Sequence, residues 1–313
     1  MKDQTEISAI VPVSDRFDES GDLARQYLEA LDQTGRDFEL IYVLDGRRAV
    51  LSEKLDMLAQ SDSRLRILQL ARTFGESTAL SAGIEAAHGK LLVSLPAYFQ
   101  IEPSGLSSLI DELEKSDMAV AVRSPRAAVS RFEVLRRNVF HWLVSRISGS
   151  SFEDLGCGAR AFTRKVGDEV PVYGDQHRFM PLLAIRRGFK VRQVQVRQSE
   201  RDRNEKVYGP KVYLQRLLDI LTIVFLVRFT KKPLRFFGMI GSMMFLLGGV
   251  FLVYLVGERL FLGIALAERP ALLLSSLLVV LGLQVFALGL LGELIIFTHA
   301  RQIKEYTIDR IVN

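Results

Sequence analysis

Two long apolar segments near the C-terminus dominate the hydrophobic pattern of this chain. Residues 236–257 and 271–292 each run for 22 residues without a charged side chain. At about 1.5 Å per residue, an α-helix of this length crosses the hydrocarbon core of a bilayer. Core helices of soluble proteins seldom stay uncharged for about six turns, so the pattern favours two membrane-spanning helices over two buried core helices. The short connection at 258–270 predicts a hairpin.

The residues before the hairpin alternate apolar runs of strand length with helical periodicity. Strands are predicted at 7–13, 38–44, 65–70, 91–95, 118–122 and 190–196, and helices at 23–31, 50–58, 78–87 and 106–113. This order is typical of an α/β domain with a mostly parallel sheet, covered on both faces, whose ligand site lies at the carboxyl ends of the strands.

No glycine-rich nucleotide motif follows these predicted strands. Neither G-x-G-x-x-G nor G-x-x-x-x-G-K-[ST] is present there, which excludes a dinucleotide fingerprint and a P-loop. The site must therefore depend on polar residues at the strand ends, and Asp15, Asp45 and the segment after residue 95 are the candidates.

The pattern changes after residue 122. A basic helix is predicted at 131–147, and the leucines of 214–229 alternate with polar residues as in a helix that lies in the membrane interface. We therefore divide the chain into an α/β domain at 1–205, juxtamembrane helices at 206–232, and the hairpin with its tail at 233–313.

Charge sets the expected location and partners. Lysines and arginines flank both sides of the hairpin, namely Arg228, Lys231, Lys232 and Arg235 before it and Arg301, Lys304 and Arg310 after it. The positive-inside rule then predicts a multi-pass inner-membrane protein with both termini in the cytoplasm. The net charge of +5 would also suit nucleic acid, but anionic headgroups or phosphate-bearing substrates explain these cations more simply, so no nucleic-acid partner is expected. The single cysteine, Cys157, excludes an intramolecular disulfide.

Four segments carry a more specific signal. They read I-V-P-V at 10–13, Y-V-L-D-G at 42–46, R-T-F-G-E-S-T-A-L-S-A-G-I-E-A-A-H-G at 72–89, and H-R-F at 177–179 with G-F-K-V at 188–191. Together with the hairpin they resemble the family-2 glycosyltransferases with a GT-A fold, in particular the membrane-anchored polyprenyl-phosphate glycosyltransferases related to dolichol-phosphate mannose synthase. The third segment is close to that family's R-N-F-G-K-x-x-A-L-x-A-G-x-x-x-A-x-G.

The resemblance implies transfer of a sugar from a nucleotide-sugar to an undecaprenyl-type phosphate on the cytoplasmic face. It implies that Asp154 orients or activates the acceptor, with a helix-capping role as the alternative. Arginines would neutralise the lipid phosphate or the departing diphosphate. The predicted catalytic residues are Asp154, Arg178 and Arg203. The predicted substrate-binding residues are Pro12, Val13, Asp15, Asp45, Gln100, Arg160, His177 and Lys206, of which Pro12 and Val13 would pack the base, Asp45 would bind the base or ribose, and His177 has a structural alternative.

The chain departs from the family at its metal-binding motif. After the fourth strand the family has D-A-D-L-Q-D-P-P, whose first acids bind Mg²⁺ or Mn²⁺, and here P-A-Y-F-Q-I-E-P stands at 96–103. Pro96 and Tyr98 take the two acid positions, and neither offers the hard oxygen ligand that a divalent cation requires. No metal cofactor is therefore expected, with Glu102 as the one alternative ligand.

A second departure is Glu76, where the family usually has lysine, and a third is Ser14-Asp15-Arg16 in place of Tyr-Asn-Glu. Three interpretations follow. The protein is a glycosyltransferase that uses arginines in place of the metal, or it takes a different donor, or it is a catalytically silent relative that acts as a binding or scaffold partner of a membrane enzyme. A homo-oligomer stays open.

Overall fold

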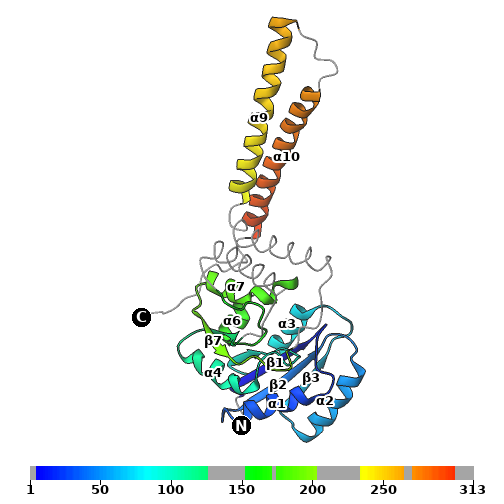
Figure 1. Cartoon of the computed structure of the whole chain (residues 1–313), viewed down its shortest axis with the longest axis vertical. Coiled ribbons are helices and arrows are strands. Elements are labelled where there is room, and N and C mark those ends of the chain that lie inside the picture. The colour runs from blue at the N-terminus through cyan, green and yellow to red at the C-terminus, as the bar shows by residue number, and fades with distance from the viewer. Residues whose placement is uncertain (1–4, 126–151, 171–173, 203–232, 264–269, 300–313) are drawn as a thin grey trace. The chain divides into compact units, whose positions relative to one another are not determined.

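The computed structural model describes residues 5–125, 152–170, 174–202, 233–263 and 270–299 (Figure 1). They belong to two compact units, a sheet domain within 5–202 and a helical hairpin within 233–299, and each is described by itself. The helices predicted at 131–147 and 214–229 and the domain boundary predicted at 205 lie outside the described residues.

The sheet domain contains a seven-stranded sheet with the order β3-β2-β1-β4-β6-β5-β7. Its strands are β1 (Ile7–Val13), β2 (Phe38–Leu44), β3 (Leu65–Gln69), β4 (Leu91–Ser94), β5 (Met118–Arg123), β6 (Arg160–Thr163) and β7 (Val191–Val196). Every strand pair is parallel except those of β6, which runs antiparallel to β4 and β5. All six predicted strands are confirmed, and the mostly parallel α/β fold with them.

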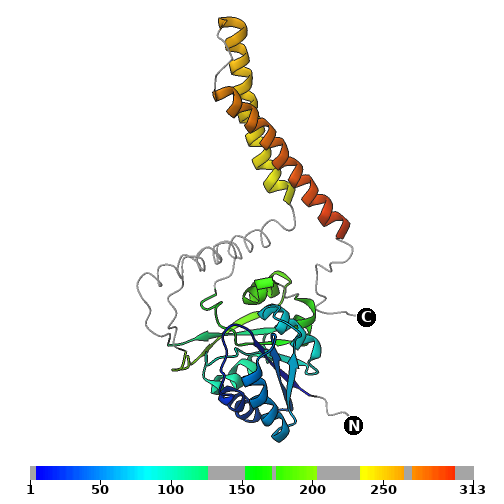
Figure 2. The ribbon, with the colours of Figure 1, turned by 90° about the vertical axis from the view of Figure 1, so that its right-hand side faces the viewer.

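Helices cover both faces of this sheet, as the views in Figures 1 and 2 show. One face carries α1 (Asp22–Asp32), α2 (Ala49–Ser61) and α4 (Leu106–Asp111), and the other carries α3 (Glu76–Ala86), α6 (Arg164–Glu169) and α7 (Met180–Arg186). Short 3₁₀ turns lie at Pro103–Gly105, Glu112–Glu114 and Gly174–Phe179. Every residue of β1 and of β2 is buried, which is why these strands read as continuous apolar runs.

The sequence did not predict β6. This strand has only four residues, R-A-F-T, and it begins with a buried arginine, so no apolar run marks it. Because β6 is antiparallel, its first residue lies at the edge where the neighbouring strands end, and Arg160 pairs with Ser94 of β4. The strand therefore brings the motif before it to the expected ligand edge.

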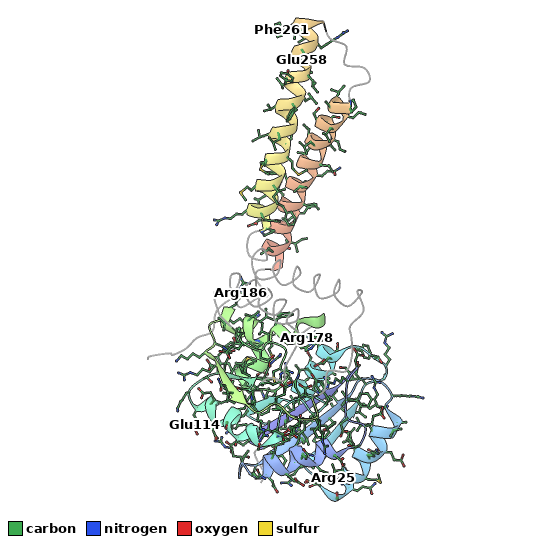
Figure 3. The ribbon with its side chains drawn as sticks, in the orientation of Figure 1. Arg25, Glu114, Arg178, Arg186, Glu258 and Phe261 are labelled. Atoms are coloured by element: carbon green, nitrogen blue, oxygen red, sulfur yellow. The ribbon has the colours of Figure 1, made fainter. Side chains whose placement is uncertain are left out.

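The hairpin consists of α9 (Pro233–Leu262) and α10 (Pro270–His299), both long and apolar enough to cross a membrane. They pack antiparallel, and the backbones meet at Gly241 and Gly282, where an added Cβ on Gly282 would lie 2.8 Å from the Gly241 carbonyl. Large apolar side chains remain exposed along both helices, Phe261 near the end of α9 by 88% (Figure 3). The predicted hairpin is confirmed.

Glu293, which follows the second predicted span, lies inside α10. Its carboxylate accepts a hydrogen bond of 3.4 Å from the backbone N–H of Leu234 in the first turn of α9. The first N–H groups of a helix have no partner within the helix, so this side chain caps the neighbouring helix. The capping carboxylate directly follows the second uncharged segment, 271–292.

Candidate functional site

The candidate site lies at the edge where the parallel strands end and β6 begins. Val13 of β1 pairs with Leu44 of β2, and the Leu95 N–H after β4 donates to the Ile10 carbonyl at 2.8 Å. Open α/β sheets bind ligands at this edge, because the loops after neighbouring strands meet there.

Asp45 organises the loop before α3. Its carboxylate, 1% exposed, accepts the backbone N–H groups of Phe74 at 2.7 Å and Gly75 at 2.9 Å. Gly46 follows with φ of 84°, and a Cβ there would lie 2.9 Å from the Thr73 hydroxyl, so only glycine fits. The Asp45 carboxylate thus holds the loop before α3 in place. Its contact to the base or ribose stays a prediction.

Three other residues predicted to bind the substrate lie at the end of β1 and just beyond it. Pro12 and Val13 are buried in the last part of β1, whereas Asp15 is exposed just beyond it. The packing of Pro12 and Val13 against a base and the substrate contact of Asp15 stay predictions.

Gln100 ties the segment after β4 to the motif before β6. Its amide Nε2 donates to the Tyr98 hydroxyl at 2.6 Å and to the Gly156 carbonyl at 3.2 Å, and its Oε1 accepts the Gly158 N–H at 2.7 Å. The side chain is only 2% exposed. Gln100 therefore holds these two loops together, and its predicted substrate contact stays a prediction.

Tyr98, at one former acid position, lies beneath a cation. The guanidinium carbon of Arg16 is 3.8 Å from the centre of the Tyr98 ring, which is the geometry of a cation–π contact. Burial raises the pKa of the Tyr98 phenol to about 12. The residue is thus a neutral phenol at physiological pH. The Pro96 carbonyl, at the other acid position, accepts the Tyr27 hydroxyl at 2.9 Å.

A buried ion-pair network holds Asp154. Arg123 at the end of β5 donates to its two oxygens, with Nε to Oδ2 at 2.6 Å and Nη2 to Oδ1 at 2.9 Å, and donates with Nη1 to Asp202 at 3.0 Å. Burial disfavours the charged guanidinium, but the hydrogen bonds and charge of Asp154 outweigh it and keep the pKa of Arg123 above its ordinary value. Arg16 pairs with the other Asp202 oxygen at 3.2 Å, which links the network to Tyr98.

Arg160 fastens the motif before β6 to the segment that carries His177. Its guanidinium donates to the carbonyls of Cys157 at 3.0 Å and Arg178 at 3.4 Å, and also to that of His177. The side chain is 2% exposed, and burial lowers the pKa of its guanidinium to about 10. The Arg160 guanidinium thus donates to carbonyls of its own chain. Its contact to the substrate stays a prediction.

His177 lies against the first turn of α3. Its Nδ1 is 2.9 Å from the Ser77 hydroxyl, and its Nε2 is 3.4 Å from the Glu76 carboxylate. Burial raises the pKa of Glu76, but the His177 hydrogen bond and the charges of His177, Arg178 and Arg160 outweigh it, so the net pKa lies below its ordinary value. The negative charge at position 76 therefore has cations of this chain around it.

The predicted phosphate-binding cations are only partly described. Arg178 is exposed beside α3 and α7 (Figure 3), while Arg203 and Lys206 lie outside the described residues. In the part of the chain that the structure describes, no three His, Cys, Asp or Glu side chains stand together as a set of metal ligands. Glu102, the alternative ligand, is partly buried before the first 3₁₀ turn.

The sequence did not single out Arg16, Arg123 or Asp202. Arg16 stands in the segment that departs from the family, Arg123 ends a predicted strand, and Asp202 belongs to a run of charges. Charge at a strand end was the available signal for Arg123, whereas only the fold brings the three together.

A family model for glycosyl transferase family 2 matches residues 8–168, from β1 to α6. The chain belongs to this family. The matched region includes the loop held by Asp45 and the ion pair between Arg123 and Asp154, and it ends before His177, Asp202 and the hairpin. Several full-length relatives extend the likeness further.

Two relatives cover nearly the whole chain. An undecaprenyl-phosphate 4-deoxy-4-formamido-L-arabinose transferase of Pectobacterium carotovorum is 30% identical over 98% of this chain and 94% of its own length. A dodecaprenyl-phosphate galacturonate synthase of Rhizobium johnstonii is 28% identical over 95% of this chain and 89% of its own. Both matches extend into the apolar helices, which together with these relatives indicate association with a membrane.

Solved structures support the fold alone. A mannosyltransferase of Pyrobaculum calidifontis, solved with GDP-Man and Mn²⁺, superposes with a TM-score of 0.50 at 14% identity, over 72% of this chain and 64% of its own. A mycobacterial protein gives the same TM-score at 20% identity, over 64% and 69%. The GT-A fold implied by the sequence is confirmed.

Proposed function

We propose that this chain transfers a sugar from a nucleotide-sugar to the phosphate of a polyprenyl lipid at the membrane surface. The observation that carries the proposal is the likeness over 98% of the chain, hairpin included, to a transferase whose named acceptor is undecaprenyl phosphate. A relative named for a different sugar also uses a polyprenyl phosphate, which supports the acceptor class more strongly than any one sugar.

The chemistry of this acceptor defines what the site has to supply. A phosphate monoester has a second pKa of about 6, so at neutral pH it attacks as a dianion and no base has to remove a proton. The bond between the anomeric carbon and the diphosphate oxygen breaks as the new carbon–oxygen bond forms, and the leaving oxygen keeps the electron pair. The site therefore needs fixed positive charge rather than a general base.

Asp154 and Arg178 fit that requirement in different ways. Both Asp154 oxygens accept from Arg123, so the carboxylate fixes a guanidinium at the ligand edge and is a positioning residue. Arg178 is exposed, and we assign it to the acceptor phosphate or the leaving diphosphate. Arg203 and Lys206 keep the same assignment as predictions from the sequence.

Transfer itself is the decisive test. The full-length protein in detergent is given undecaprenyl phosphate with each common UDP- and GDP-sugar, and the lipid is analysed by mass spectrometry. A glycosylated lipid is the expected product. Arg178→Ala should lower kcat about 30- to 1000-fold, as expected for one lost charge contact. The matched control is Arg186→Ala, an exposed arginine at the end of α7 (Figure 3).

Asp154→Asn should lower transfer, because it weakens the fixation of Arg123 at the ligand edge. If the wild type glycosylates the lipid with none of the donors, the proposal is overturned. The catalytically silent alternative is not favoured, since full-length likeness to transferases with different sugars supports turnover.

We also propose that the protein lies in the inner membrane with both termini in the cytoplasm, as its flanking cations suggest. The test uses single cysteines in a Cys157→Ala background. Phe261→Cys, close to the hairpin turn, should react with an impermeant thiol reagent in intact cells. Val50→Cys, exposed on α2, should react only after lysis. The reverse pattern would refute this orientation.

A further inference from the structure

The sheet domain carries a cation beside Tyr98, a residue that the family resemblance places at a metal-binding position. Arg16, from the segment after β1, covers the ring of Tyr98, which replaces one of the two metal-binding acids. The guanidinium carbon lies 3.8 Å from the ring centre, and the Arg16 side chain remains 42% exposed. A cation of the chain is thus both fixed at this position and accessible to a ligand.

Asp202 holds Arg16 in place. Its Oδ1 accepts from Arg16 Nη2 at 3.2 Å, and its Oδ2 accepts from Arg123 at 3.0 Å and from Gln198 at 2.7 Å. Asp202 is 2% exposed, so it is a rigid anchor. The planar fork of N–H donors on a guanidinium matches phosphate oxygens.

Tyr98 offers a hydroxyl donor beside this cation. Its oxygen already accepts the Gln100 amide N–H at 2.6 Å, so the phenol proton is directed away from Gln100. Gln100 is itself held by the Gly158 N–H, so the side on which the phenol oxygen accepts is fixed. A phenol so held suits an anionic acceptor such as a phosphate oxygen.

The same residues fit a divalent cation poorly. Asp154 and Asp202, two buried carboxylates of the network that holds Arg16, each accept from the Arg123 guanidinium. A metal ion beside Tyr98 would also lie close to the Arg16 charge and be repelled by it. Pro96 contributes only a backbone carbonyl, and the Tyr27 hydroxyl donates to it.

We propose that Arg16 and Tyr98 hold the diphosphate of the nucleotide-sugar in place of a divalent cation. The inference rests on the proposed function and deepens it. When the sugar–oxygen bond breaks, the electron pair passes to the diphosphate oxygen, and the Arg16 charge and the Tyr98 hydroxyl stabilise that oxygen. The phosphate dianion supplies the new bond, so the step needs no further reactant.

Nucleotide affinity tests this directly. The full-length protein in detergent is titrated calorimetrically with UDP and with GDP, in EDTA and in Mn²⁺. We expect binding of one nucleotide in EDTA with no gain from Mn²⁺. Arg16→Gln and Tyr98→Phe should each weaken it about 10- to 100-fold, as expected for the loss of one hydrogen bond to a charged phosphate oxygen.

Arg201→Gln is the matched control. Arg201 covers the neighbouring Phe99 ring at 4.6 Å, so its replacement removes the same charge and the same kind of stacking next to the site. Its nucleotide affinity should equal that of the wild type. Arg16→Lys keeps the charge without the planar fork and should bind with intermediate affinity. Unchanged thermal unfolding of each variant shows that it is folded.

The outcomes separate this inference from the proposed function. Binding that requires Mn²⁺, or an Arg16→Gln variant that binds as well as the wild type, would overturn the role of Arg16, although lipid glycosylation would still stand. Failure to bind either nucleotide, together with no lipid product, would overturn both. A weakened Arg16→Gln with an unaffected Arg201→Gln supports the inference.

Discussion

Replacing Arg123 by methionine should destabilise the sheet domain more than any change at an exposed arginine. Its guanidinium is 8% exposed, and the two carboxylates that it joins, Asp154 and Asp202, are 3% and 2% exposed. Removing one partner of a buried ion pair costs about 3–5 kcal/mol, because the remaining charge stays buried without it. That cost corresponds to a roughly 150- to 5000-fold larger equilibrium constant for unfolding.

Arg192→Met is the matched control on the neighbouring strand β7. Arg192 pairs with Glu112 at 3.4 Å, but its side chain is 60% exposed. An exposed ion pair contributes about 0–1 kcal/mol, so the same substitution should have little effect here. The double variant Arg123→Met with Asp154→Asn removes one of the two stranded charges and should recover part of the lost stability.

The single cysteine reports the unfolding. Cys157 is fully buried, and burial raises the pKa of its thiol to about 11, so a thiol reagent reacts with it only after the domain opens. Its labelling rate across a urea series gives the free energy of opening for the full-length protein in detergent. If Arg123→Met is labelled no faster than Arg192→Met, the reasoning about the buried network is refuted.

Three further predictions concern other parts of the chain. Burial raises the pKa of Glu39, but hydrogen bonds from Ser8, His88 and Arg66 outweigh it, so the net pKa lies below 4.5. The ionised Glu39 therefore stabilises the folded domain fully above pH 4.5. This contribution is lost as the pH falls through the lowered pKa. Glu39→Gln should flatten this acid dependence in urea unfolding. Gly282→Leu should lower the thermal stability of the hairpin in circular dichroism, whereas Gly249→Leu, where a Cβ meets nothing within 4 Å, should not. Asp45→Asn should speed hydrogen exchange at the Phe74 and Gly75 N–H groups about tenfold or more, since one acceptor is lost.

The strands were readable from the sequence because parallel strands buried on both faces form continuous apolar runs. The ends of all six predicted strands agree with the structure to within one residue. The strand β6 was not predicted, because its four residues include a buried arginine whose partners are carbonyls of other loops. Only tertiary contacts make that segment a strand, and hydropathy does not reveal them.

The site was readable only where a motif marks it. Arg16 and Asp202 meet across 186 positions, and Ser77 and His177 across 100, so no local pattern connects them. Glu76 shows the limit most clearly. From the sequence alone, Glu76 is a negative charge where the family usually has lysine. In the fold, burial raises the pKa of its carboxyl, but His177, Arg178 and Arg160 lie close enough to lower it overall. Pairing between distant charges depends on the sheet order, which periodicity alone does not supply.

The ion pair between Arg123 and Asp154 closes a loop, because it joins the two ends of the chain segment 124–153. Both closing residues lie in the sheet domain. Loop entropy grows slowly, by about 0.6 kcal/mol for each doubling of length. We therefore expect the folded sheet domain to tolerate changes in the length of segment 124–153. Relatives could vary its length and sequence while both ends stay anchored at the ligand edge, and a graft of this segment between two of them should leave the sheet domain folded.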